Sequence, residues 1–214
     1  MDYNAGQLIR CATVVFWDFD GVIKASVDVK TNAFVTLFHQ FGDDIVFRVR
    51  EHHETYCGMS RLEKIPLYLQ WAGKDLSLAS QFCDQFARLV VDEVIKSPWV
   101  PGAEDYLRSN SYRQKFVLVS ATPQSELEQI LLALDLLHCF CAIFGAPVRK
   151  RDAIRMTLGL LEVNPEDCLV IGDSQEDSVA AQINAVPFLL RKNSTNAKIF
   201  KYYKGVAIDD FVIS

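Results

Sequence analysis

The sequence lacks several features that would each assign it to a particular class of protein. Lys and Arg total 22 against 27 Asp and Glu, which gives a formal net charge of -5. A basic face for nucleic acid is therefore not expected. No stretch approaches the roughly 18 uncharged apolar residues of a membrane helix. The first ten residues have no basic start followed by an apolar run, so we expect neither a signal peptide nor a membrane partner.

The cysteines also exclude two kinds of site. The chain has six of them, and none forms a C-x-x-C pair, so neither a zinc knuckle nor a thioredoxin-like motif is indicated. Cys139 and Cys141 lie in an apolar stretch, where we expect buried, reduced thiols. Reduced thiols favour a cytoplasmic location.

What the sequence does contain is a set of short apolar runs. Runs at 13–19, 115–121, 168–173 and 186–191 have the composition of buried parallel strands. Helical patterns separate the later three. Strands that alternate with helices predict an α/β fold with a mainly parallel sheet.

The segment 25–97 differs from the rest because its pattern is helical almost throughout. Gly42 and Gly73 are placed where helices would stop, and Pro98 and Pro101 mark the return of the chain. We therefore predict an all-helical domain over 25–97, inserted after the first strand. Residues 1–24 and 98–214 would form the α/β core domain.

Acidic and hydroxyl side chains follow the predicted strands. Asp18 and Asp20 end the first strand, Ser120 ends the second, and "GDSQED" places Asp173 and Asp177 after another. Ligands of open α/β sheets bind outside the carboxyl ends of the strands. Four acids gathered there would raise one another's pKa or need a cation. Oxygen ligands point to Mg²⁺.

This group of residues suits phosphoryl transfer. A carboxylate beside Mg²⁺ is a competent nucleophile toward phosphorus, and a second acid can protonate the leaving oxygen and later deprotonate water. Ser120, backbone N–H groups and a lysine would bind the phosphoryl oxygens. Lys150 of "GAPVRK" is the best candidate, although Arg149 or Arg151 could take its place. Asp173, Asp177, Ser120 or Lys150 alone would be ordinary, so the hypothesis depends on their joint occurrence. Asp18 differs, because an acid directly after a four-residue apolar run is costly unless it is paired or solvated.

Four motifs carry a family resemblance: "DFDGV", "VLVSAT", "GAPVRK" and "VIGDSQED". In order and spacing they resemble the haloacid dehalogenase-like phosphohydrolases over nearly the whole chain. The resemblance implies a Rossmann-like, three-layer core with an all-helical cap inserted after the first strand. The cap looks like that of the subfamily that includes phosphoglycolate phosphatases and β-phosphoglucomutases.

The resemblance also implies roles for the acids. Asp18 would be the nucleophile that forms an aspartyl-phosphate, and Asp20 the general acid/base. Asp18, Asp20, Asp173 and Asp177 would form the metal site, with Asp20 contributing its backbone carbonyl. Asp177 would orient the metal's waters or the lysine.

Further residues would contact the substrate. The resemblance implies that Ser120 and Lys150 hold the transferring phosphoryl group, with Ala121 beside them. An aspartate at position 20 favours phosphate esters over haloacids, whose leaving group needs no proton.

The cap loop "CGMSRLEKI" resembles the loop that contacts substrate in the subfamily. Ser60 and Arg61 are the candidates there, since Arg61 suits a phosphate or carboxylate. His52 and His53 precede this loop. They could face the cleft, although a pair on the helix surface is the more common arrangement.

The favoured function is thus a Mg²⁺-dependent phosphatase acting on a small phosphorylated metabolite, with a sugar phosphate as the leading example. A β-phosphoglucomutase-like phosphomutase is the alternative. A receiver-like signalling domain and a non-catalytic binding relative are further hypotheses. Both a monomer and a homodimer remain open.

Overall fold

The sheet is parallel throughout. The computed structural model of the chain describes residues 4–212, so residues 1–3 and 213–214 of the predicted core domain lie outside it. Within the described residues the strand order is β3-β2-β1-β4-β5-β6, and each neighbouring pair is parallel. The strands are β1 (Val14–Trp17), β2 (Lys115–Pro123), β3 (Ala142–Ala146), β4 (Cys168–Gly172), β5 (Phe188–Arg191) and β6 (Ala207–Ile208). The predicted α/β fold is confirmed.

Four of these strands match the predicted apolar runs, and two were missed. β3 lies in the same long apolar stretch as the end of α7, and its first three residues are only half-buried. No change in the spacing of apolar residues therefore marked the point where the helix ends and the strand begins. β6 has two residues, which is too short for a pattern. Both lie at an edge of the sheet, where one side of a strand has no neighbour.

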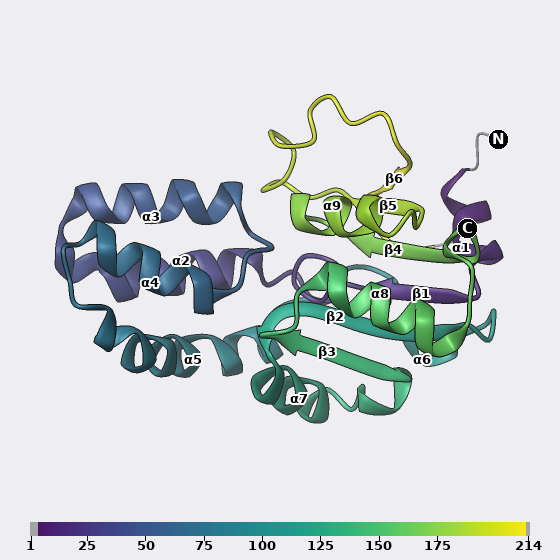
Figure 1. Ribbon diagram of the computed structural model, residues 1–214, viewed down its shortest axis with the longest axis horizontal. Coiled ribbons are helices and arrows are strands. Elements are labelled where there is room, and N and C mark those ends of the chain that lie inside the picture. The colour runs from purple at the N-terminus through teal and green to yellow at the C-terminus, as the bar shows by residue number, and fades with distance from the viewer. Residues whose placement is uncertain (1–3, 213–214) are drawn as a thin grey trace.

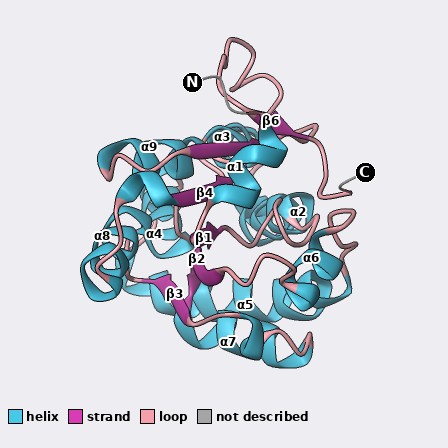
Figure 2. Ribbon diagram, turned by 90° about the vertical axis from the view of Figure 1, so that its right-hand side faces the viewer, coloured by secondary structure: helices cyan, strands magenta, loops and turns pink. Residues whose placement is uncertain are grey.

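Helices cover both faces of the sheet. The helices α1 (Ala5–Cys11), α6 (Ala103–Ser109), α7 (Gln124–Ala133), α8 (Lys150–Leu161) and α9 (Gln175–Ile183) surround it. Figure 2 shows α8 and α9 on one side of the strands and α6 on the other. This arrangement confirms the predicted three-layer core.

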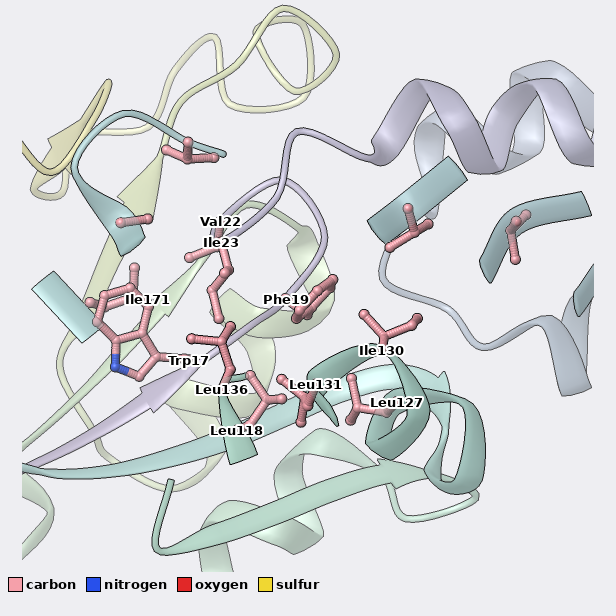
Figure 3. Packing of buried hydrophobic residues seen from close by; sticks show 14 of the residues in the cluster. Trp17, Phe19, Val22, Ile23, Leu118, Leu127, Ile130, Leu131, Leu136 and Ile171 are labelled. Atoms are coloured by element: carbon pink, nitrogen blue, oxygen red, sulfur yellow. The ribbon is translucent and has the colours of Figure 1, made fainter. Parts of the chain in front are cut away.

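Successive side chains of β1 point to opposite faces of the sheet, which explains the two layers of packing. Val14 and Phe16 belong to the cluster that includes residues of α8 and α9. Val15 and Trp17 belong to the larger cluster on the opposite face. Figure 3 shows part of that cluster, with Phe19 near residues of α7. The central strand is thus buried on both faces, as its continuous apolar run predicts.

Between β1 and α6 the described secondary structure is helical. It comprises α2 (Val27–Phe38), α3 (Asp43–Thr55), α4 (Arg61–Trp71) and α5 (Ala79–Lys96), with the short 3₁₀ turns His39–Phe41 and Leu76–Leu78. Figure 1 shows these four helices grouped beside the carboxyl ends of the strands. Gly42 and Gly73 follow helical segments with φ values of 94° and 64°. Both glycines are helix stops, as predicted.

The two connections to this helical segment lie side by side. The Ala25 N–H donates to the Pro98 carbonyl at 2.8 Å, and Lys24 forms a β-bridge with Trp99. Lys24 is buried, and its Nζ donates to the Ile95 carbonyl at 3.0 Å. The exact domain boundaries, between residues 24 and 25 and between residues 97 and 98, stay a prediction. We use "cap" below for the helical segment 25–97.

Two further sequence-based expectations concern cysteines and membranes. The six cysteines, all within the described residues, are free, but Cys141 is exposed, so its predicted burial is wrong. The Cys141 Sγ contacts the Phe116 carbonyl at 3.2 Å, and Cys139 is only half-buried. None of the helices described is both long and apolar enough to span a bilayer.

Candidate active site

The topology brings the predicted acids together at one edge of the sheet. β1 lies between β2 and β4, so the residues that follow these strands are neighbours. Carboxylate oxygens of Asp18, Asp173 and Asp177 lie within 4.8 Å of one another, and all three residues are buried. Three of the four acids predicted as a metal site therefore form one cluster, which we call the acidic cluster.

Lys150 lies against this cluster. It is the first residue of α8, and its Nζ is 2.9 Å from Asp18 Oδ2 and 2.7 Å from Asp177 Oδ1. Burial by itself would lower the pKa of Lys150, but the charges of Asp177 and Asp18 outweigh it and raise the pKa. Lys150 therefore stays protonated between the two acids. Arg149 and Arg151, the alternatives for this role, are exposed.

Burial and mutual repulsion perturb the acids themselves. Asp18 is 6 % exposed, and burial, followed by the nearby charge of Asp177, raises its pKa well above the ordinary value. The same two causes raise the pKa of Asp173 to about 7. Three carboxylates share one ammonium group, so a divalent cation with oxygen ligands fits the remaining negative charge.

Two neighbours fix the position of Asp173. Gly21 has a φ of 79°, and a Cβ there would overlap the Asp173 carboxylate, so only glycine permits this turn. Asn193 Nδ2 donates to Asp173 Oδ2 at 2.7 Å. Asn193 was missed from the sequence. The signal available was its place just after β5, at the same edge of the sheet.

Asp20 lies outside the acidic cluster. Its carboxylate accepts hydrogen bonds from Ser26 Oγ at 2.6 Å and from Lys30 Nζ. Lys30 Nζ also donates to Thr122 Oγ1 at 2.8 Å. The side chain of Asp20 is therefore not a fourth member of the cluster, and the carbonyl role implied by the family stays a prediction. Sequence analysis missed Lys30, which lies one turn into α2.

Ser120 lies within β2, which continues to Pro123, so the prediction that it ends the strand is wrong; the pairing of β2 with β1 stops just before it, at Leu118. Ser120 is 1 % exposed, and its Oγ accepts the Thr122 N–H at 3.1 Å. Ala121 lines the cavity described next. The predicted phosphoryl-binding roles of Ser120, Ala121 and Lys150 are compatible with these positions and stay predictions.

A small cavity lies between the acidic cluster and the cap. Its volume is about 40 Å³, with Asp18, Asp20 and Lys150 on the sheet side and Lys30, Phe34, His53 and Arg61 on the cap side. At roughly 10–15 Å³ per water molecule it has room for a few waters only. A phosphorylated metabolite therefore does not fit within this cavity alone.

The cap loop is packed closely against the core. A Cβ on Gly58 would lie 2.7 Å from Glu176 Oε2 and would also overlap Ser174 Oγ. A larger groove of about 600 Å³ also borders this loop, and its lining includes Ser60 together with Ser120, Ala121 and Lys150. Ser60 is the N-cap of α4, and its Oγ accepts the Leu62 N–H at 3.3 Å. Ser60 therefore borders the larger groove, which reaches Lys150, and does not line the small cavity.

Arg61 reaches the cavity but is paired with an acid. Its guanidinium makes two contacts with the Glu126 carboxylate of α7, one of them 3.2 Å between Nη1 and Oε1. This buried ion pair connects cap and core. The predicted substrate contact of Arg61 stays a prediction.

The two histidines differ in position. His53 lines the cavity and is 3 % exposed, so the expectation of a surface pair is wrong for this residue. His52 Nδ1 lies 2.9 Å from the Tyr68 hydroxyl within the cap. The apolar stripe of α3 is short, with Val49 and His53 as its buried residues, so the sequence did not show which histidine faces inward.

Comparison with solved structures gives a consistent fold. β-Phosphoglucomutase from Clostridium difficile is 24 % identical, with a TM-score of 0.72 over 94 % of this chain and 92 % of that one. CbbY from Rhodobacter sphaeroides, solved in complex with phosphate, is 16 % identical, with a TM-score of 0.73 over 94 % and 95 %. A predicted phosphoglycolate phosphatase from Haemophilus somnus is 19 % identical, with a TM-score of 0.70 over 94 % and 95 %.

The family itself follows from a sequence model. The comparison with curated proteins returned no match. The model of the haloacid dehalogenase-like hydrolases matches residues 12–183, well over half of the chain, and this range contains the acidic cluster and Lys150. The chain therefore belongs to the haloacid dehalogenase-like hydrolase family.

Proposed function

We propose that the protein is a Mg²⁺-dependent phosphatase that hydrolyses a small phosphorylated metabolite through an aspartyl-phosphate. The observation that carries this proposal is the contact of Lys150 with Asp18 inside the acidic cluster. A buried carboxylate beside a fixed ammonium group can attack a phosphorus atom whose oxygens that ammonium group binds. The free cysteines support a cytoplasmic location as part of the same proposal.

In the first step a carboxylate oxygen of Asp18 attacks phosphorus, and the bond from phosphorus to the ester oxygen breaks. Asp18 Oδ1 accepts the Phe19 N–H at 2.8 Å, which fixes the orientation of the carboxylate. Lys150 and Ser120 bind the transferring oxygens. Mg²⁺, held by Asp18, Asp173 and the Asp20 carbonyl, would supply the positive charge that offsets the phosphoryl group.

Asp20 moves the protons in this scheme. It donates a proton to the departing ester oxygen in the first step. In the second step it takes a proton from water as the water oxygen attacks phosphorus, which releases inorganic phosphate and restores Asp18. Ser26 and Lys30 contact the Asp20 side chain beside the cavity, and the charge of Lys30 stabilises the carboxylate left after the first step.

The deciding experiment measures phosphate release from a panel of sugar phosphates and other phosphorylated metabolites with Mg²⁺. We expect wild-type turnover that EDTA abolishes and that Asp18→Asn lacks, because an amide cannot form the acyl-phosphate. Asp28→Asn, an exposed acid on α2, is the matched control and should retain activity. Full activity of Asp18→Asn would refute the nucleophile.

A phosphomutase is the second candidate. The small volume of the cavity beside Asp18 favours it, since a mutase must keep water from the aspartyl-phosphate. Turnover of a sugar monophosphate to its isomer, dependent on a catalytic amount of the bisphosphate and with little phosphate release, would select it. The family match removes the support for a receiver-like signalling domain.

A further inference from the structure

The cations that line the small cavity all have acidic partners. Each of the three basic side chains in its lining contacts an acid, in the pairs Lys30–Asp20, Arg61–Glu126 and Lys150–Asp18. His53, which also lines the cavity, adds no charge, because burial and the charge of Lys64 hold its pKa well below the ordinary value. Asp18 and Asp20 take part in the proposed reaction, whereas Glu126 has no role in it. The question is therefore what Glu126 does in this cavity.

Glu126 occupies the end of the Arg61 guanidinium. Arg61 begins α4 in the cap, and Glu126 lies in the first turn of α7 in the core. The two side chains are 9 % and 7 % exposed, and Nη1 and Nη2 each contact one oxygen of the carboxylate. The guanidinium also lies over the ring of Phe86, 5.1 Å from its centroid. The pair of N–H groups with which an arginine binds a planar anion is thus already used by this chain's own carboxylate.

The position of Glu126 along the chain connects it to the predicted phosphoryl-binding residues. α7 directly follows β2, the strand that contains Ser120 and Ala121. Asp20, the proposed acid for the ester oxygen, lines the same cavity as Glu126 and Arg61. A leaving group attached to that oxygen therefore begins beside these side chains.

An anionic leaving group would compete with Glu126 for Arg61. If the anion took the guanidinium, the Glu126 carboxylate would be left buried without its cation. If Glu126 kept the guanidinium, the anion would be buried without one. Either arrangement buries an unpaired negative charge, which is costly. An uncharged leaving group avoids this cost, and its hydroxyl groups can donate to the remaining lone pairs of the Glu126 carboxylate.

We propose that Glu126 is a specificity-determining residue that excludes phosphate esters whose leaving group carries a second negative charge. The substrate is then the monophosphate of an uncharged, hydroxylated molecule, such as a polyol or a sugar. Specificity in proteins often depends on such a repulsive element against the wrong ligand. The same exclusion applies to the bisphosphate on which a mutase depends. This inference rests on the proposed phosphatase function and narrows the class of ester that it acts on.

The test compares the binding of matched esters that differ by one charge on the leaving group. 3-Phosphoglycerate has a carboxylate where glycerol 3-phosphate has a hydroxymethyl group, and the same change relates 2-phosphoglycolate to 2-hydroxyethyl phosphate. Each ester is used to inhibit the hydrolysis of a reporter, either p-nitrophenyl phosphate or the best substrate of the metabolite panel. Its inhibition constant is then obtained whether or not it is turned over. We expect the ester with the uncharged leaving group to bind at least about 10-fold more tightly in both pairs. A smaller ratio in either pair overturns the proposal.

Variants assign the preference to Glu126. Glu126→Gln keeps the shape of the side chain and frees the Arg61 guanidinium, so the anionic ester should now bind more tightly in both pairs. Arg61→Met combined with Glu126→Leu removes the cation together with the acid and should keep the wild-type order, because no cation is set free. Glu128→Gln, which changes an exposed acid of α7, is the matched control and should leave the ratios unchanged. The wild-type order of binding in a folded Glu126→Gln protein overturns the proposal.

Phosphate release from the reporter separates this inference from the function on which it rests. If the wild type hydrolyses neither p-nitrophenyl phosphate nor any metabolite of the panel, the phosphatase proposal fails and the inference fails with it. Hydrolysis that depends on Asp18, without the expected order of binding, leaves the function standing and overturns only the inference. Circular dichroism shows whether each variant is folded. If Glu126→Gln is unfolded, the two wild-type ratios alone decide for or against the proposal.

Discussion

The two walls of the cavity treat buried charge differently. On the sheet side, Lys150 lies between Asp18 and Asp177, so opposite charges are in direct contact. On the cap side, Lys64 contacts a neutral histidine and packs near the ring of Phe34. The sheet side thus has an excess of negative charge around its buried cation, whereas the buried lysine of the cap has no carboxylate in contact among the described residues. The difference suggests that the chemistry is fixed by the sheet and that recognition is supplied by the cap.

The largest expected effect is on the sheet wall. Lys150→Met removes the cation that contacts the nucleophile, and kcat should fall about 10³-fold, as for the loss of a donor that stabilises transition-state charge. Steady-state kinetics with p-nitrophenyl phosphate would measure it. Arg149→Met and Arg151→Met, exposed neighbours, should change kcat by less than about 2-fold. A comparable loss in either would assign the phosphoryl-binding cation to that arginine instead.

The next largest effect concerns the Arg61–Glu126 ion pair, which connects the cap to the core. Glu126→Gln leaves the Arg61 guanidinium buried without its counter-ion, and the free energy of unfolding should fall by about 3 kcal/mol. Arg61→Met with Glu126→Leu removes both charges and should recover much of that loss. Urea unfolding of the single and double variants gives the coupling energy. Strictly additive losses would show that the pair contributes no coupling in solution.

A third prediction uses the uncompensated charge of Lys64. The pKa of Lys64 is about 7 in the folded protein and about 10.4 in an unfolded chain. Between pH 7 and pH 10 Lys64 is therefore protonated in the unfolded chain and largely deprotonated in the folded protein. The Lys64 contribution therefore becomes more favourable to folding as pH rises from 7 to 10. Lys64→Met should stabilise the protein by roughly 2 kcal/mol at pH 6 and by clearly less at pH 9. Urea unfolding of both proteins at the two pH values measures this, and a difference independent of pH would contradict it.

The smallest effect is expected from the contact of the cap loop with the core. Gly58→Ala places a methyl group against Glu176 and Ser174, which should hold the cap slightly open. We expect KM to rise about 10-fold, because closure supplies part of the binding energy. Gly159→Ala on α8, where φ is not positive and a Cβ meets no atom within 4 Å, is the control for a glycine substitution without a steric contact. Equal kinetics of Gly58→Ala and wild type would show that the loop adapts.

The sequence predicted the sheet wall much better than the cap wall. Apolar runs located β1, β2, β4 and β5, and the acids after them could be placed at one edge from the parallel topology alone. The contact of Lys150 with Asp18 spans more than 130 positions, yet the order of motifs anticipated it. These features depend on strand ends, which local patterns mark clearly.

The cap wall depends on which side of each helix faces inward. Lys64 and His53 are polar residues in helices whose apolar stripes are short, so their burial could not be read from periodicity. The Arg61–Glu126 pair depends on how α4 meets α7, and no local pattern encodes that meeting. Substrate recognition by Ser60 and Arg61 stays a prediction for the same reason.

The side-by-side arrangement of Ala25 and Pro98 has an evolutionary consequence. A segment that leaves and rejoins a fold at one point can be lengthened, replaced or lost with little disturbance to the strands. Descendants of such a chain can acquire new metabolites by exchanging the inserted part, while the reaction they perform is inherited unchanged. Modularity of this kind requires only that the two linking peptides stay paired.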